Sequence, residues 1–350
     1  MRMKTRQGGV AIVTALLLTT LAISIVASLF WQQQVQVRTM ENQRLHLQTK
    51  WILRGALDWA TLVLRQDGMD HNQYTALDAV WATPLAETRL DQYIERERVE
   101  GENFNATLSG TITDATSRYN LTNLGSKDRT DQNDAVNVFR KLLQNLQLNP
   151  ALATRTANLV KASQPPVPKL DQDTEQGKDD KVDGGKVDGG QDGITSPDPT
   201  GQAKTPPASK TMKLLKVEDL LAVEGFTPEM IEKLRPFVIV LPVPTPVNVN
   251  TAPAEVLAAV LPNTSVSQAN ALLVRRKQAA WRDFEHFKTE VKGAEDLPKS
   301  TADVKSEWFL VDSHIRLDRA ALDSVSLVNR PLSGLNVTMN GTSVQWTHEY

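Results

Sequence analysis

Residues 10 to 31 read VAIVTALLLTTLAISIVASLFW and contain no charged side chain. A helix of this length rises roughly 33 Å, which is enough to cross the hydrocarbon core of a bilayer. Three basic residues and no acid precede it, namely Arg2, Lys4 and Arg6. Because Lys and Arg are enriched on the cytoplasmic side of membrane helices, we expect residues 1–9 to be cytoplasmic and the bulk of the chain to lie outside.

Three interpretations of this segment compete. It is typical of a plain signal anchor, and Val26-Ala27-Ser28 loosely matches the small-residue site of a cleaved secretory signal. The apolar run is long for such a signal and continues to Trp31. Arg6-Gln7-Gly8-Gly9 closely resembles the end of a type IV prepilin leader, which favours Gly9 as the last residue removed and Val10 as the mature N-terminus. This resemblance implies a single-pass protein of the bacterial inner membrane with a periplasmic body.

The helical pattern continues beyond Trp31 as an amphipathic stem over residues 32–66. Apolar residues recur at three- and four-residue steps, among them Leu53, Leu57 and Leu64. Gln66-Asp67-Gly68 is a stop signal, so the spacing predicts a helix ending near Arg65. We expect Leu53, Leu57 and Leu64 to contact a partner chain, with ordinary core packing of the upper half of the stripe as the alternative.

The rest of the chain divides into a split α+β domain around a large helical insertion. Residues 103–113 alternate apolar and polar and predict a half-buried strand within the first part, 67–126. Strands return in the closing part, 295–350, where Phe309 to Leu317 alternate and Asn340-Gly341 suits a hairpin turn. We therefore predict a long N-terminal helix packed on a small antiparallel sheet.

The insertion, 127–294, is predicted to be all-α. Helices are expected over 134–146, with Asp131 or Asn133 as cap, and over 152–161. Residues 163–209 are rich in Pro and Gly and lack aromatic residues, which is typical of a flexible acidic loop. Two helical modules follow at 210–240 and 247–294, the second starting with Thr251 as cap and Pro253 just inside the helix.

Two strings carry a wider resemblance. Ser117 to Leu124 reads SRYNLTNL, similar to a "G-R-(F/Y)-N-L-N-x-L" motif, and residues 248–252 read NVNTA. With the leader, they resemble the K-type minor pseudopilins of type II secretion systems, in which the helical modules are like sterile-alpha-motif or helix-hairpin-helix units. The resemblance implies a subunit of the pseudopilus that is needed to export folded proteins. It also implies I- and J-type minor pseudopilins, a prepilin peptidase and the inner-membrane secretion platform as partners.

Thr14 stands at the fifth mature position, where most pilins and pseudopilins carry Glu. In those proteins the carboxylate is thought to pair with the N-terminal amine of a neighbouring subunit. An unpaired carboxylate at this depth in a membrane would be costly. A subunit without it suits the pseudopilus tip, and this absence resembles the K-type family.

Calcium is a cofactor that the resemblance implies. Eight acids lie between Asp171 and Gly193, and clustered carboxylates can bind Ca²⁺. The family's "D-W-x-D-x-D" stretch is replaced here by LVKAS at 159–163, and the spacing of an EF-hand is missing. A solvated acidic linker is the simpler interpretation.

Catalytic motifs are missing from the sequence. The chain has no cysteine, and its five histidines are scattered without a metal-binding or triad spacing. A net charge of −2 gives no global attraction for nucleic acid. The alternative function, a membrane-tethered helix-hairpin-helix DNA-binding protein, depends on one basic cluster, Arg275, Arg276 and Lys277. We therefore expect no enzymatic activity and no nucleic-acid partner.

We predict that a prepilin peptidase cleaves after Gly9 and exposes Val10. Mass spectrometry of the N-terminal peptide of the mature protein measures this directly. A mature chain that begins at Met1, or near Ser28, would contradict it and favour the anchor or the secretory signal.

Overall fold

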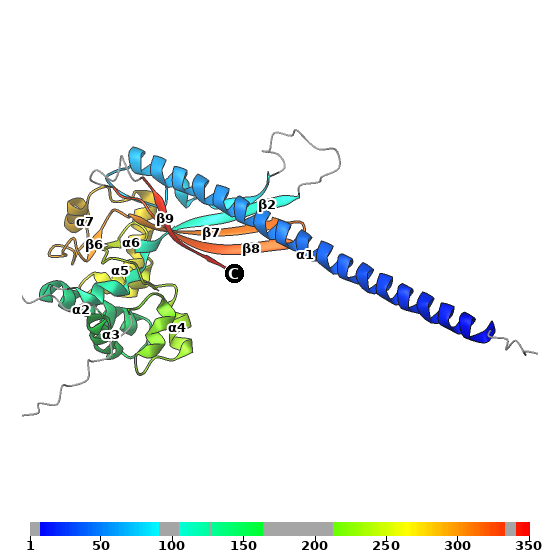
Figure 1. The fold of residues 1–350 in the computed structure, drawn as a ribbon. Coiled ribbons are helices and arrows are strands. Elements are labelled where there is room, and N and C mark those ends of the chain that lie inside the picture. The colour runs from blue at the N-terminus through cyan, green and yellow to red at the C-terminus, as the bar shows by residue number, and fades with distance from the viewer. Residues whose placement is uncertain (1–7, 91–104, 127, 164–212, 333–340) are drawn as a thin grey trace, which may run out of the picture.

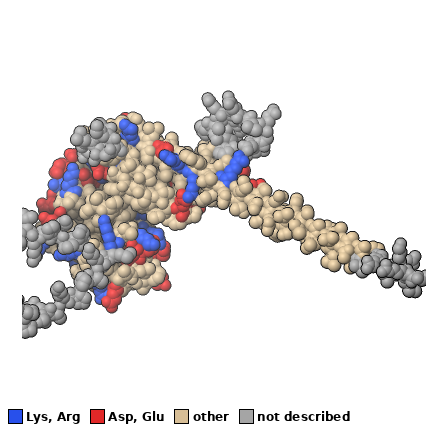
Figure 2. Space-filling view, in the orientation of Figure 1, with Lys and Arg blue, Asp and Glu red and all other residues tan. Residues whose placement is uncertain are grey.

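A single unbroken helix, α1 (Gly8–Asp70), organises the molecule. The computed structural model describes residues 8–90, 105–126, 128–163, 213–332 and 341–350. Within those ranges α1 is the one helix long and apolar enough to cross a membrane. Its N-terminal half projects from the rest of the protein and its C-terminal half lies along a sheet (Figure 1). Figure 2 shows that charged side chains are concentrated away from the projecting half, as expected for a membrane anchor.

The helix ends at Asp70 rather than near Arg65 as the stop signal predicts. Gly68 lies inside the last turns of α1, and a Cβ on it would meet Arg330 Cδ at 3.2 Å. This glycine therefore allows a buried arginine to approach the helix and does not end it.

Five antiparallel strands form the sheet in the order β1-β2-β7-β8-β9. Their bounds are β1 Leu85–Arg89, β2 Ala106–Asp114, β7 Trp308–Leu317, β8 Ala320–Asn329 and β9 Ser343–Glu349. β2 and β7 are neighbours although the whole insertion separates them in the sequence, with Ala106 opposite Leu317 and Asp114 opposite Phe309. The predicted α+β class, with its split antiparallel sheet, is confirmed.

The C-terminal half of α1 packs on one face of this sheet. Leu53, Leu57 and Leu64 are buried in one cluster with Phe309 and Ile315 of β7. Their four- and seven-residue spacing places them on one side of the helix, facing alternate residues of the strand. The opposite face of the sheet has a separate apolar cluster: Ala115, Ile239, Leu241, Trp308, Leu310 and Leu327.

Short helices of the insertion gather at the end of the sheet away from the projecting half of α1 (Figure 1). They are α2 Arg129–Asn145, α3 Leu152–Ala162, α4 Pro228–Leu234, α5 Ala254–Val260, α6 Val266–Gln278 and α7 Phe284–Glu290. The short 3-10 helices are η1 Val80–Ala82, η3 Ala115–Ser117, η4 Leu121–Gly125 and η5 Val217–Ala222. Two parallel pairs of two-residue strands are also present: β3 Tyr119–Asn120 with β4 Val238–Ile239, and β5 Val247–Asn248 with β6 Ala302–Asp303. The insertion is therefore mainly helical but not all-α.

Two predicted helix caps are wrong. Helix α2 starts earlier than predicted, because the Asp128 carboxylate accepts the backbone N–H of Thr130 at 2.7 Å and takes the place of Asp131 or Asn133. The cap position of α5 belongs to Pro253, because Thr251 is turned to a buried carboxylate elsewhere. Residues 164–209 of the predicted loop, and the first half of the predicted hairpin up to Asn340, lie outside the described residues.

Leu64→Ala should lower the free energy of unfolding by about 2–5 kcal/mol, because the substitution leaves a cavity between α1 and the sheet. Leu62→Ala is the matched control, since Leu62 lies one half-turn away and is exposed. Chemical denaturation of the full chain in detergent, followed by tryptophan fluorescence, compares the two. Equal losses in both variants would show that α1 does not pack on the sheet in this register.

Candidate functional site

The sheet and the insertion meet at the buried carboxylate of Asp114, the last residue of β2. Its Oδ2 accepts hydrogen bonds from Asn248 Nδ2 at 2.9 Å, Thr251 Oγ1 at 2.6 Å and Ser306 Oγ. Its Oδ1 accepts the backbone N–H and the hydroxyl of Thr116, both at 2.8 Å. A buried carboxylate is costly unless such donors surround it, so Asp114 fixes the three segments that supply them.

Arg330, which follows β8, extends the same junction to the end of α1. Its guanidinium pairs with Asp67 Oδ2 at 2.5 Å and donates to Thr75 Oγ1 at 2.9 Å. It also donates to the carbonyl of Ser306, and its Cζ lies 4.6 Å from the Phe309 ring centroid. Burial lowers the pKa of Arg330, and the facing Asp67 carboxylate counteracts that shift. Sequence patterns did not identify this ion pair, because its partners are far apart along the chain.

The NVNTA string supplies side chains to this junction. Asn248 donates to Asp114 and also to the carbonyl of Thr75, while Thr251 donates to Asp114. Asn250 exchanges hydrogen bonds of 2.8 and 2.9 Å with the backbone of Trp281 in the insertion. The string therefore joins the insertion to the sheet through buried polar side chains.

The SRYNLTNL string, residues 117–124, binds a second segment of the insertion, residues 241–245, through polar side chains. Asn120 donates to the carbonyl of Val243 at 2.8 Å and accepts from the backbone N–H of Leu241 at 3.1 Å. Asn123 exchanges hydrogen bonds of 2.8 and 2.9 Å with the backbone of Thr245. These two asparagines hold the extended segment 241–245 in the way that a neighbouring strand would.

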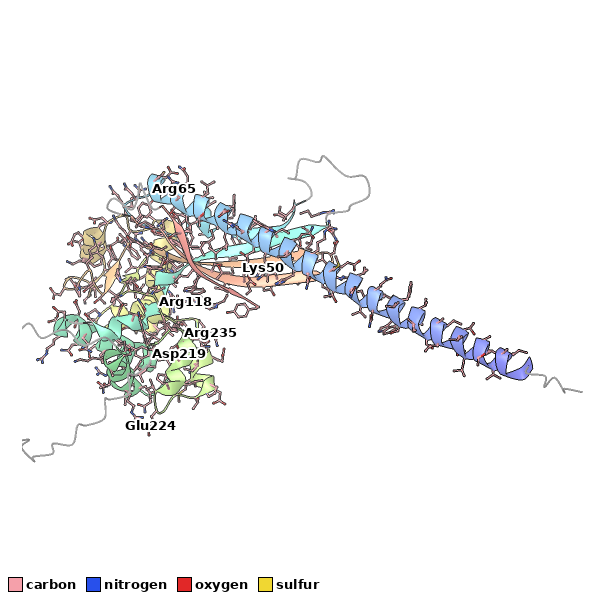
Figure 3. All side chains as sticks on the ribbon, in the orientation of Figure 1. Lys50, Arg65, Arg118, Asp219, Glu224 and Arg235 are labelled. Atoms are coloured by element: carbon pink, nitrogen blue, oxygen red, sulfur yellow. The ribbon has the colours of Figure 1, made fainter. Side chains whose placement is uncertain are left out.

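Arg118 of that string lies between the sheet and the insertion (Figure 3). Burial lowers the pKa of Arg118, and the Asp312 carboxylate of β7 opposes the shift. Burial also raises the pKa of Asp312, and here Arg118 opposes it. This half-buried pair adds an electrostatic contact within the α+β domain, between the SRYNLTNL string and β7.

The structure contradicts the predicted contact between a partner chain and the stem residues Leu53, Leu57 and Leu64. Their exposed fractions are 4%, 8% and 0%, because the sheet of the same chain covers them. The alternative, core packing of the upper stem, is the one observed.

A different face of α1 carries exposed apolar side chains with charged ones among them: Asp58 lies on the same side, and Arg54 lies over the Trp51 ring at 5.9 Å from its centroid. Three apolar side chains are exposed there: Leu47 is 58% exposed, Trp51 69% and Leu62 62%. Their spacing places them opposite the buried stripe of Leu53, Leu57 and Leu64. Gly55 lies between them, and a Cβ built on it meets no atom within 4 Å. Figure 3 shows Lys50 on the part of α1 above the sheet, where Glu349 of β9 pairs with it at 3.0 Å. This stem surface, Leu47, Trp51, Gly55 and Leu62, is open to another helix.

The predicted residues near the N-terminus all lie in the projecting half of α1. Gly9 and Val10 are in its first turns, and cleavage between them stays a prediction. The hydroxyl of Thr14 donates to the carbonyl of Ala11 at 3.0 Å within the same helix. Thr14 therefore meets its hydrogen-bonding requirement without another subunit.

The basic cluster on α6 is engaged inside the protein. Arg275 pairs with Glu290, and Arg276 donates to the carbonyls of Val249 at 2.9 Å and Ala252 at 2.7 Å. Burial lowers the pKa of Arg276 to about 10. Two of the three cations on which DNA binding depended are thus structural, and the alternative function loses its main support.

The described residues do not fit a metal site. Among them no group of three His, Cys, Asp or Glu side chains is arranged to hold a metal ion. LVKAS at 159–163 offers no carboxylate, and Asp171 to Gly193 lies outside the described ranges. Calcium binding stays a prediction.

Asp114→Asn should destabilise the protein by about 3 kcal/mol, since the new amide N–H₂ faces groups that donate to the carboxylate. Asp323→Asn is the control, because Asp323 is exposed in β8 and pairs only with His314 among the contacts described. Thermal unfolding of both variants and of the unmodified chain compares them. A stable Asp114→Asn protein would show that the carboxylate does not hold the junction.

This chain is similar to known proteins of one name over most of its length. Two models of type II secretion system protein K match this chain, one over residues 247–306 and one over residues 185–243. Type II secretion system protein K of Pseudomonas aeruginosa is 28% identical over 95% of this chain and 91% of its own length. The protein of the same name from Pectobacterium carotovorum is 24% identical over 96% and 95%.

The fold also matches a solved structure. A chain of the GspK-GspI-GspJ complex from the enterotoxigenic Escherichia coli type 2 secretion system superposes with a TM-score of 0.59 at 20% identity. The match covers 89% of this chain and 99% of that one. Two family models match adjoining segments, and relatives of one name align over nearly the whole length, so the chain is similar to type II secretion system protein K from end to end.

Proposed function

We propose that this chain is a minor pseudopilin of a type II secretion system, needed for export of folded proteins from the periplasm across the outer membrane. The observation that carries the proposal is α1, which runs without a break from an apolar, membrane-length segment onto the antiparallel sheet. A non-catalytic, structural role fits this architecture. Residues 10–31 anchor the chain in the inner membrane, with residues 1–9 cytoplasmic and the body periplasmic.

The proposed partners are other minor pseudopilins of the I and J types, because the solved structural neighbour is a complex of three such subunits. The stem surface is their contact. It combines exposed apolar side chains with the exposed Asp58, and Gly55 permits close approach of a second helix. A prepilin peptidase and the inner-membrane platform would act on the N-terminal segment.

Placement at the pseudopilus tip is supported by two features. Position 14 is a threonine whose hydroxyl donates a hydrogen bond within its own helix. It therefore offers no carboxylate to pair with the amine of a subunit added above. The insertion is fixed rigidly to the sheet through Asp114, and its bulk is difficult to repeat along a closely packed filament.

Leu62→Glu should abolish secretion and reduce co-purification with the I- and J-type subunits at least about tenfold, since it places an unpaired charge in an apolar contact. Leu215→Glu is the matched control, because Leu215 is 72% exposed, against 62% for Leu62, and lies in the insertion. Secretion is measured in a strain that lacks the chain and carries each variant. Both proteins should unfold at the temperature of the unmodified chain.

Two results would contradict parts of this proposal. Normal secretion and normal complex formation by Leu62→Glu would exclude the stem surface as the contact. Labelling that found this subunit at regular intervals along the filament shaft would exclude the tip.

A further inference from the structure

The turn between β7 and β8 lies beside α1 where that helix leaves the body (Figure 1). Arg319 of this turn donates to Glu41 Oε2 at 3.1 Å and to Asn42 Oδ1 at 2.9 Å. Both acceptors are on α1, ten and eleven residues beyond Trp31. The two contacts therefore hold the turn at one fixed height on the helix.

The helix sets the height of this turn above the bilayer. α1 is unbroken from Gly8 to Asp70, so distances along it follow from its rise per residue. Tryptophan prefers the membrane interface, which places Trp31 at the edge of the hydrocarbon core. Arg38 then lies roughly 10 Å beyond that edge, and Glu41 roughly 15 Å. The headgroup layer is about 5–7 Å thick and membrane helices tilt by about 20° on average, so a tilt toward the sheet brings the turn onto the headgroups.

Arginines predominate at this height. The segments 38–44 of α1 and 316–319 of the turn hold four arginines and two acids: Arg38, Arg44, Arg316, Arg319, Glu41 and Asp318. Figure 2 shows Lys and Arg side chains where α1 leaves the body, next to the uncharged projecting half. This end of the body therefore suits an anionic surface.

Two of these arginines have donors to spare. Arg38 makes no hydrogen bond or ion pair with the residues that the structure describes. Arg319 uses only its Nη2 group for Glu41 and Asn42, and its side chain is 56% exposed. A guanidinium group donates well to phosphate oxygens. Because residues 11–44 of α1 are exposed, phospholipid headgroups are the ligand that the anchor itself brings within reach.

We propose that Arg38 and Arg319 bind phosphate groups of the leaflet on the body's side, and that the β7–β8 turn rests on that leaflet. The contact fixes the direction in which α1 tilts, and with it the orientation of the stem surface while the subunit is in the membrane. This inference rests on the anchoring part of the proposed function and needs no partner subunit.

Single cysteines can carry a fluorophore, since the chain has none of its own. The full chain is placed in nanodiscs of phosphatidylcholine and phosphatidylglycerol that contain a lipid with a quencher on its headgroup. Gln33→Cys reports the headgroup layer, and Ala321→Cys reports the turn, where Ala321 is exposed. Ala151→Cys is the matched control, because Ala151 is exposed at the start of α3, which Figure 1 places at the other end of the body. We expect quenching at positions 33 and 321 and none at 151.

Charge variants test the phosphate contact. Arg38→Gln and Arg319→Gln should each lower the equilibrium constant for the membrane-seated turn about fivefold, measured from quenching at position 321, because one Arg near an anionic surface contributes about that factor to binding. Arg38→Gln is the cleaner variant, since it breaks no contact within the described structure. Arg282→Gln is the control that removes an exposed charge from the insertion, and it should change nothing. Nanodiscs of phosphatidylcholine alone should weaken quenching at position 321, and so should high salt.

The outcomes separate this contact from the anchor. Quenching at position 33 without any at 321 would overturn the contact and leave the proposed function standing. Quenching at neither position would contradict the anchor as well. Quenching at 321 that is indifferent to both arginine variants and to lipid charge would show that the helix alone places the turn there, and the phosphate contact would be refuted.

Discussion

The buried carboxylate of Asp114 is the constraint on which the rest of the structure depends. A charge in this position is tolerated only if donors surround it, and here they come from segments 134, 137 and 192 residues further along the chain. Removing any one segment would leave donors and acceptors unpaired in the interior. The insertion is therefore held in one orientation on the sheet, although the chain leaves and re-enters the sheet at neighbouring strands.

Arg330 connects that constraint to the membrane anchor. Its guanidinium joins Asp67, in the last turns of α1, to the Ser306 carbonyl beside the Asp114 cluster. The long helix thus ends in the same polar junction that fixes the insertion. The insertion and the anchor are thus connected through one buried ion pair and the hydrogen bonds around it.

Sequence patterns predicted the elements better than their contacts. The apolar span, the long helix and the strand near residue 106 follow from local periodicity, so they were identified. Periodicity shows that one side of a helix is covered but not what covers it, and Leu53 and Leu57 were therefore assigned to the wrong neighbour. Thr251 looked like a cap because its true partner, Asp114, lies 137 residues away. No local signal indicated the Asp67 to Arg330 pair.

The two sides of α1 explain how one helix serves both fold and assembly. The subunit's own sheet uses the side with Leu57 and Leu64, so a partner helix can reach only the opposite side. That side would be a liability in a free soluble protein, because exposed Trp51 and Leu62 favour nonspecific association. In a membrane-anchored subunit the projecting half of α1 aligns neighbouring helices before they meet. On the proposed contact, the exposed face would meet a parallel helix, and the cost of ordering the pair would be reduced because the membrane has already oriented both.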